Sequence, residues 1–191
     1  MTANDKDVPA PGDDIELHLQ FLMDPFGDEP HRRQREISVH YLLAHADRAY
    51  PRLVQALKAN PAALNSPSII EVLPLFARAD SVPLLEAIMN RSIEQVSAVA
   101  GQALGRHPDA SAKDALLRGL ASSLPDVMAA AADGLMVRGD SSVCSDLKTL
   151  LRHKNSIVRY HVVQASYKLG CLNRDQMEEL RRAYPELSGL L

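Results

Sequence analysis

The chain has 191 residues, of which 46% are hydrophobic and 24% are charged, and its formal net charge is −3. This composition is ordinary for a soluble globular protein, and no apolar run approaches the roughly 18–20 residues that a membrane span needs. Aromatic residues make up only 4% of the chain and Trp is absent, so a core has to be built from Leu, Val, Ile and Ala.

The N-terminal part of the sequence is strongly acidic. Residues 1–30 hold eight acidic residues and one Lys, whereas the remainder holds 20 Lys and Arg residues against 16 acidic ones. Residues 1–12 are also polar and contain Pro, the opposite of a secretory signal peptide. We predict that residues 1–12 form a disordered acidic arm, and that the protein is cytoplasmic.

Residues 13–30 predict an N-terminal capping helix and a linker. The end of a repeat array would expose an apolar face to water unless another element covered it. The alternative is a partner-binding or membrane-surface helix, but a membrane-surface helix needs Lys or Arg on its polar face, and this one carries Asp and Glu. The apolar residues at helical spacing are Ile15, Leu19, Leu22, Met23 and Phe26.

Residues 31–191 contain a repeat of about 31 residues. Val96, Val127 and Val158 are each separated by 31 residues. A period in this range, with helical spacing inside each unit, predicts an array of helix pairs. A polar residue recurs in the turn inside each unit: Asp47, Asp80, Asp109, Asp140 and Asn173.

Each unit carries signals for the ends of its helices. Ser92 and Ser111 are predicted to begin helices as parts of capping boxes. Pro74 lies inside a predicted helix and should kink it.

The first helix of each repeat unit carries unusually small side chains. Ala103, Gly134 and Ala165 recur where a core helix would normally carry a large side chain. Small residues let helix axes approach toward the lower end of the usual 8–10 Å range. We therefore predict that each first helix is sandwiched between its partner and its neighbours.

Two segments, "VSAVAGQALG" at residues 96–105 and "VRYHVVQASYKLG" at residues 158–170, resemble the HEAT-repeat family in its short form named from phycobilisome lyases. The resemblance covers about residues 31–191. It implies a ladder of Arg and Asp side chains, but the Arg after Val is kept only at Arg159, and Ser97 and Met128 replace it elsewhere. The predicted fold is an all-α, right-handed α-solenoid of about five HEAT-like helix pairs with an N-terminal capping helix.

The sequence offers no catalytic constellation. Glu36 and His40 share a helix face at a spacing compatible with a metal, but a hydrogen-bonded or salt-bridged surface pair is far commoner. Cys144 and Cys171 are too few and too far apart for a disulfide framework, and we expect them to be reduced residues that fill space in the core. We predict no catalytic, cofactor-binding or metal-binding residue, and no enzymatic activity.

Basic residues accumulate in the last third of the chain. Residues 147–185 contain eight Lys and Arg residues against three acidic ones. Leucines that face the core orient the second helices, so the neighbouring basic side chains point outward and could form a ridge. An ordinary solvated charged face is an equally favoured interpretation of these basic residues. The predicted partner-binding residues are Arg118, Lys148, Arg152, Arg181 and Arg182.

These features favour a non-enzymatic protein–protein interaction module, such as an adaptor, a chaperone or a toxin-neutralising immunity-type protein. Its concave surface would bind a partner with an acidic surface. One alternative, implied by the name of the repeat, is a bilin lyase-type enzyme, but the chain has little aromatic or polar lining for a chromophore pocket. The other is a HEAT-like nucleic-acid-binding protein, which an isoelectric point near 6.1 and the lack of Trp disfavour.

Overall fold

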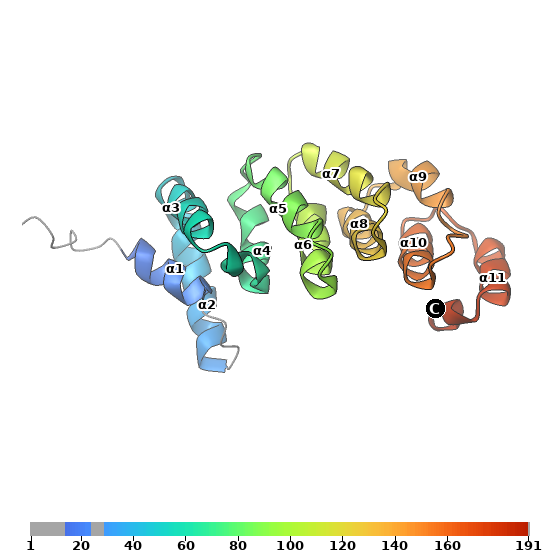
Figure 1. Ribbon diagram of the computed structural model, residues 1–191, viewed down its shortest axis with the longest axis horizontal. Helices are drawn as coiled ribbons and strands as arrows, with labels where there is room; N and C mark the ends of the chain where they lie inside the picture. Colours follow the sequence, from blue (N-terminus) through green and yellow to red (C-terminus); the bar gives the residue numbers. More distant parts are fainter. Residues whose placement is uncertain (1–13, 24–28, 191) are drawn as a thin grey trace, which may run out of the picture. The chain divides into compact units, whose positions relative to one another are not determined.

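The computed structural model describes residues 14–23 and 29–190, and within these ranges all regular structure is helical (Figure 1). The chain divides between residues 69 and 70 into two compact units. The predicted acidic arm, residues 1–12, lies outside the described residues, as does Phe26. The all-α prediction is confirmed, and the helices fit an α-solenoid; its handedness and the number of helix pairs stay predictions.

The first unit contains α1 (Ile15–Met23), α2 (Glu29–Ala44), α3 (Ala46–Ala59) and the 3-10 helix η1 (Pro61–Asn65). Of the apolar stripe predicted here, Ile15, Leu19 and Leu22 are buried and Met23 is half-buried, and α1 packs on α2 and α3. His18 lies on the same buried face, where its Nδ1 is 3.0 Å from the hydroxyl of Ser38. Asp47 does not lie in a turn between helices, as predicted. Helix α3 begins at Ala46, so Asp47 belongs to the first turn of that helix.

The helix predicted around Pro74 is interrupted as expected. Helix α4 (Pro67–Val72) ends two residues before this proline, and the chain continues as the 3-10 helix η2 (Leu73–Phe76). Ala77 follows in the left-handed region with φ of 52°. Within an α-helix Pro74 would donate no hydrogen bond and its ring would clash with the carbonyl four residues earlier, which favours the early end of α4.

The second unit shows the predicted period directly. Helices α6, α8 and α10 begin at Glu94, Pro125 and Ser156, each 31 residues after the last, and they form one row in Figure 1 with α5, α7 and α9 in another. Helix α8 packs on both α6 and α10. The elements are α5 (Ser81–Met89), α6 (Glu94–Arg106), α7 (Ser111–Leu120), α8 (Pro125–Arg138), η3 (Ser141–Val143), α9 (Cys144–Lys148), α10 (Ser156–Lys168), α11 (Arg174–Ala183) and η4 (Pro185–Gly189).

The contact between α6 and α8 explains why both helices carry glycine where they meet. A Cβ atom added to Gly101 would overlap the backbone carbonyl of Ala130, and one added to Gly134 would overlap the backbone carbonyl of Gly101 and a methyl of Leu116. Ala103 is fully buried beside them. The two backbones therefore touch, and α6 and α8 are sandwiched as predicted.

Asp109, Asp140 and Asn173 act as helix caps, whereas Asp80 and the predicted capping serines do not. Asp109 accepts a hydrogen bond from the backbone N–H of Ser111 at 2.9 Å, and Asn173 forms a capping box with Gln176. Asp140 accepts one from the N–H of Ser142 at 2.9 Å. Ser92 has a φ of 54° and lies outside α6, which begins at Glu94. Carboxylate and amide side chains reach the free N–H groups of a first helical turn well, so the turn residues take the capping role.

The two cysteines correct an expectation. Cys144, at the start of α9, and Cys171, in the turn before α11, form a disulfide with their Cα atoms 5.3 Å apart. The prediction of reduced cysteines is wrong, because a separation of 27 residues places two side chains at facing positions on successive repeats. The bond ties α9 to the last helix pair.

Candidate partner-binding surface

Ion pairs connect the second helices of successive repeats. Arg118 on α7 donates from Nε and Nη2 to the two carboxylate oxygens of Glu86 on α5, at 2.7 Å each. Arg152, which follows α9, donates to Glu179 on α11 at 2.6 Å. Both arginine side chains stay about 60% exposed, so each pair remains accessible to a partner.

A third connection joins α7 to the start of the next second helix. Lys113 donates from Nζ to Asp140 at 2.7 Å and to the hydroxyl of Ser142 at 2.5 Å. The hydrogen bond from Lys113, aided by those from Ser142, holds the pKa of the Asp140 carboxyl well below its ordinary value. Ion pairs thus connect α5 to α7, α7 to the residues that precede α9, and the residues that follow α9 to α11.

The structure distributes the five predicted binding residues differently from the sequence hypothesis. Arg118 and Arg152 are engaged with Glu86 and Glu179. Arg181 turns back to Glu178 at 3.2 Å and to the backbone carbonyl of Ser188 at 2.9 Å. Three of the five predicted cations are therefore paired with carboxylates of the same chain, and their role in binding stays a prediction.

Lys148 and Arg182 differ from the other three cations. Both are exposed, and within the described part of the chain neither forms an ion pair. Of the five predicted residues, Lys148 and Arg152 come together at one hollow, whereas Arg118 lies on α7 and Arg181 and Arg182 lie at the end of α11.

That hollow lies between α9 and α11 and has a volume of about 260 Å³. Its apolar lining comes from Leu151, from Leu172 beside the disulfide, and from Leu180 on α11. We call it the basic groove. Its polar lining residues are Lys148, Thr149, Arg152, Gln176 and Glu179.

Two constraints hold the basic groove in place. The disulfide links the start of α9 to the turn that leads into α11, and the ion pair between Arg152 and Glu179 spans the same two segments. The walls are therefore linked covalently and by an exposed charge pair. The arrangement can hold a carboxylate close to Lys148 and Arg152 while an apolar group contacts the leucines.

The opposite row of helices uses polar links that are buried or half-buried. His161 on α10 places Nδ1 2.7 Å from a carboxylate oxygen of Asp133 on α8, and this hydrogen bond raises the pKa of His161 above its ordinary value. His107 is almost fully buried between the hydroxyl of Ser81 and the backbone N–H of Asp109. Burial lowers the pKa of His107.

Arg159 is the one residue that matches the Arg of the resembled motif, and it is buried. It donates to the backbone carbonyl of His153 at 2.6 Å, pairs with Glu186, and stacks 4.1 Å from the ring centre of Tyr184. These contacts attach α10 to η4 and the segment before it. Arg159 therefore has a structural role in the last repeat.

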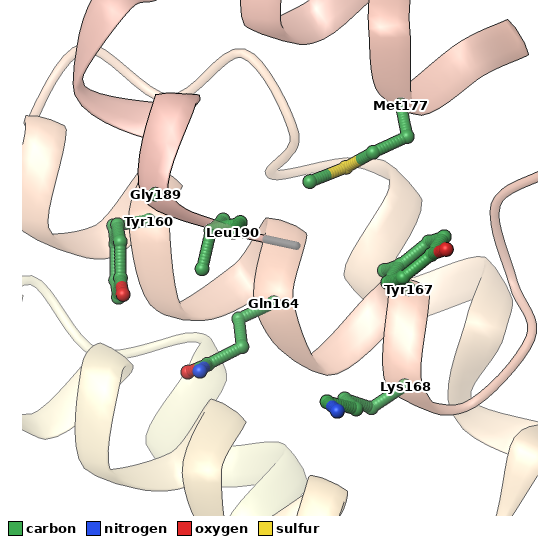
Figure 2. A pocket seen from close by; sticks show the side chains of 7 residues that line it. All are labelled: Tyr160, Gln164, Tyr167, Lys168, Met177, Gly189 and Leu190. Carbon is green, nitrogen blue, oxygen red and sulfur yellow. The ribbon is translucent and has the colours of Figure 1, made fainter. Parts of the chain in front are cut away.

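A second hollow, of about 170 Å³, lies on the other side of the last repeat (Figure 2). Tyr160, Tyr167 and Lys168 belong to α10, and Leu190 follows η4. We call it the tyrosine pocket. Its residues carry no recognisable motif, so no pattern in the sequence indicated it. The remaining lining residues are Gln164, Met177 and Gly189.

The described residues contain no group of three or more His, Cys, Asp or Glu side chains arranged to hold a metal ion. The Nδ1 of His40 lies 2.8 Å from the backbone carbonyl oxygen of Glu36, one helical turn earlier. None of the helices in residues 14–23 and 29–190 combines the length and the apolar character that crossing a bilayer requires.

Comparison with known proteins agrees with this geometry. Residues 81–167, from the start of α5 to the penultimate residue of α10, match the family model of HEAT repeats. No curated protein matches the chain. The match does not distinguish the phycobilisome-lyase-type form, and it supports HEAT repeats within residues 81–167.

Proposed function

We propose that this protein is a non-catalytic module that binds another protein through the basic groove. HEAT repeats generally mediate protein–protein interaction, and the groove offers the two elements that such contacts combine. Its leucines supply an apolar floor, and its cations supply directional contacts to carboxylates. The partner would present an acidic segment that also carries an apolar side chain.

The observation that carries this proposal is the position of Lys148. It lies in the groove beside Arg152 but has no carboxylate partner among the described residues, whereas Arg152 is paired with Glu179. An incoming carboxylate can therefore bind Lys148 without displacing an existing ion pair. Electrostatic complementarity of this kind mainly sets specificity and association rate.

An adaptor, a chaperone and an immunity-type protein each require such a complementary surface. The cytoplasmic location also remains a proposal. The disulfide weighs against it, because disulfides persist mainly in oxidising compartments.

Selection from a random peptide library tests the proposal, because the library samples many candidate segments at once and does not require an identified partner. We expect the immobilised protein to enrich peptides that combine acidic and apolar residues. The double variant Lys148→Glu/Arg152→Glu should lose this enrichment, because it places two negative charges at the groove.

The matched control is Lys154→Glu/Arg174→Glu. These two cations are exposed in the same part of the chain but do not line the groove, and their reversal changes the net charge equally. Unchanged enrichment by the groove variant would contradict the proposal. Equal loss in the control would show a nonspecific charge effect and would contradict it too.

A further inference from the structure

The tyrosine pocket lies on the side of the last repeat that is opposite the basic groove. The side chains of Met177 and Leu190 form its buried part, at 1% and 8% exposure. Tyr160 and Tyr167 are half-buried and stand on either side of Leu190, as Figure 2 shows. The buried parts belong to the apolar cluster that closes the C-terminal end of the second unit.

Polar groups that the fold does not use surround this apolar interior. Lys168 is exposed, and in the described ranges it has no ion-pair partner. The hydroxyls of Tyr160 and Tyr167 likewise have no hydrogen bond there. In Figure 2, Gln164 and Lys168 lie on the side of the pocket opposite Met177. None of the seven lining residues is acidic, so the pocket has a positive rim.

The size of the pocket selects the kind of ligand. Sites for small molecules and cofactors have volumes of about 300–1,000 Å³, whereas this pocket has about 170 Å³. The available space is suited to one large side chain. Protein interfaces use such pockets for a single aromatic or aliphatic anchor residue, which contributes much of the binding energy.

The chemistry of the lining residues further restricts which side chain can serve as the anchor. Tyr rings offer faces and edges to an aromatic group, and the thioether of Met177 adapts to its shape. The free ammonium of Lys168 at the rim selects for a carboxylate close to the anchor. Both requirements are met by a peptide segment in which a Phe-like side chain is flanked by Asp or Glu.

From this geometry we infer that the tyrosine pocket receives one aromatic side chain of a partner protein while Lys168 binds an adjacent carboxylate of the same segment. This site is separate from the basic groove, and the inference stands whether or not the groove binds a partner. It assigns to the α10 face of the last repeat a second interaction surface with its own specificity.

The test uses three synthetic peptides and the full chain labelled with ¹³C at its methionine methyl groups. The first peptide has Phe flanked by Asp and Glu, the second has Ala in place of Phe, and the third has Lys in place of the acids. We expect the first peptide at millimolar concentration to shift the Met177 methyl resonance in a saturable manner. The Ala and Lys peptides should shift it several-fold less.

Two variants locate the binding. Lys168→Glu should weaken binding of the acidic peptide several-fold, whereas the matched Lys154→Glu should leave it unchanged. Gly189→Leu should obstruct the pocket, because Gly189 is one of its lining residues, and the fold should tolerate the change, because a Cβ at this position meets no atom within 4 Å. Helical content and melting temperature of each variant establish that the fold is kept.

Several results would overturn the inference. They are the absence of any Met177 shift, equal shifts from the Phe and Ala peptides, equal shifts from the acidic and Lys peptides, and unchanged binding by both Lys168→Glu and Gly189→Leu. A loss of the shift caused by Lys148→Glu/Arg152→Glu would also overturn it, because it would place the binding in the basic groove.

Discussion

Two contacts between successive repeats show opposite ways of joining helices. Between α6 and α8 the backbones touch at Gly101 and Gly134, where no side chain would fit. Between α9 and α11 the walls stand apart around a hollow of about 260 Å³ and are joined by a disulfide and an exposed ion pair. The first contact gives rigidity through dense packing. The second leaves room for a partner and keeps that space open with side-chain links.

The largest expected effect concerns the link at the groove. Replacing both Cys144 and Cys171 with Ser should lower the free energy of unfolding by about 3–4 kcal/mol, because the bond closes a loop with a sequence separation of 27 residues. Urea unfolding measures this loss. Reduction of the wild type with a dithiol should lower its free energy of unfolding by a similar amount. The same treatment should leave the free energy of unfolding of the double variant unchanged. Identical midpoints for all three would mean that the bond does not support this region.

The next effect concerns the dense contact. Gly134→Leu should destabilise the protein by about 2–3 kcal/mol, because the new side chain overlaps the backbone of Gly101 and the side chain of Leu116. Thermal or urea unfolding measures it. Gly189→Leu is the matched control, since a Cβ there meets no atom within 4 Å. If both variants melted alike, α6 and α8 would not be in close contact.

A smaller effect depends on pH and separates the buried His107 from the half-buried His161. The bond to Asp133 raises the pKa of His161 in the folded protein, so this group stabilises the fold fully below its unfolded pKa. The contribution is lost as the pH rises from about 6.5 through the raised value. NMR titration of the imidazole should place the pKa of His161 above that of an unfolded peptide and the pKa of His107 below it. Asp133→Asn should return the pKa of His161 toward its ordinary value. An unchanged pKa of His161 in this variant would contradict the role given to Asp133.

The smallest effect concerns the exposed ion pair. A double-mutant cycle on Arg152 and Glu179 should give a coupling of about 0.5 kcal/mol, because both side chains are exposed and solvent screens them. The coupling should decrease as salt is added. A coupling of several kcal/mol that resisted salt would mean that this pair, rather than the disulfide, holds the groove walls together.

The periodic features of the fold could be predicted from the sequence. The 31-residue spacing of Val96, Val127 and Val158 reappears as the spacing of the starts of α6, α8 and α10. The small residues of α6 and α8 correctly indicated close packing. The helix caps were only partly predicted. Ser92 and Ser111 match a local capping pattern but do not cap, whereas the observed cap hydrogen bonds are accepted by the turn residues Asp109, Asp140 and Asn173 and by Asn155 before α10.

The pairing of side chains between repeats could not be predicted from the 31-residue period alone. Several facing side chains on neighbouring repeats are separated by 27 residues, which is one repeat less about one helical turn. Of the predicted cations, Arg152 meets its carboxylate at this offset, whereas Arg118 meets Glu86 at a separation of 32 residues. A search for complementary residues 27 apart would have found four contacts: Lys113 with Asp140, Cys144 with Cys171, Arg152 with Glu179, and Arg159 with Glu186.

Hydrogen–deuterium exchange with an acidic peptide from the library selection tests most directly whether the basic groove is the binding surface. The account predicts slower exchange in residues 148–152 and 174–183 when the peptide is bound, and no change in residues 94–106, where α6 is packed against α8. It also predicts that Lys148→Glu/Arg152→Glu abolishes this protection. Protection confined to the first unit, or unaltered protection in the double variant, would contradict the assignment of partner binding to the basic groove.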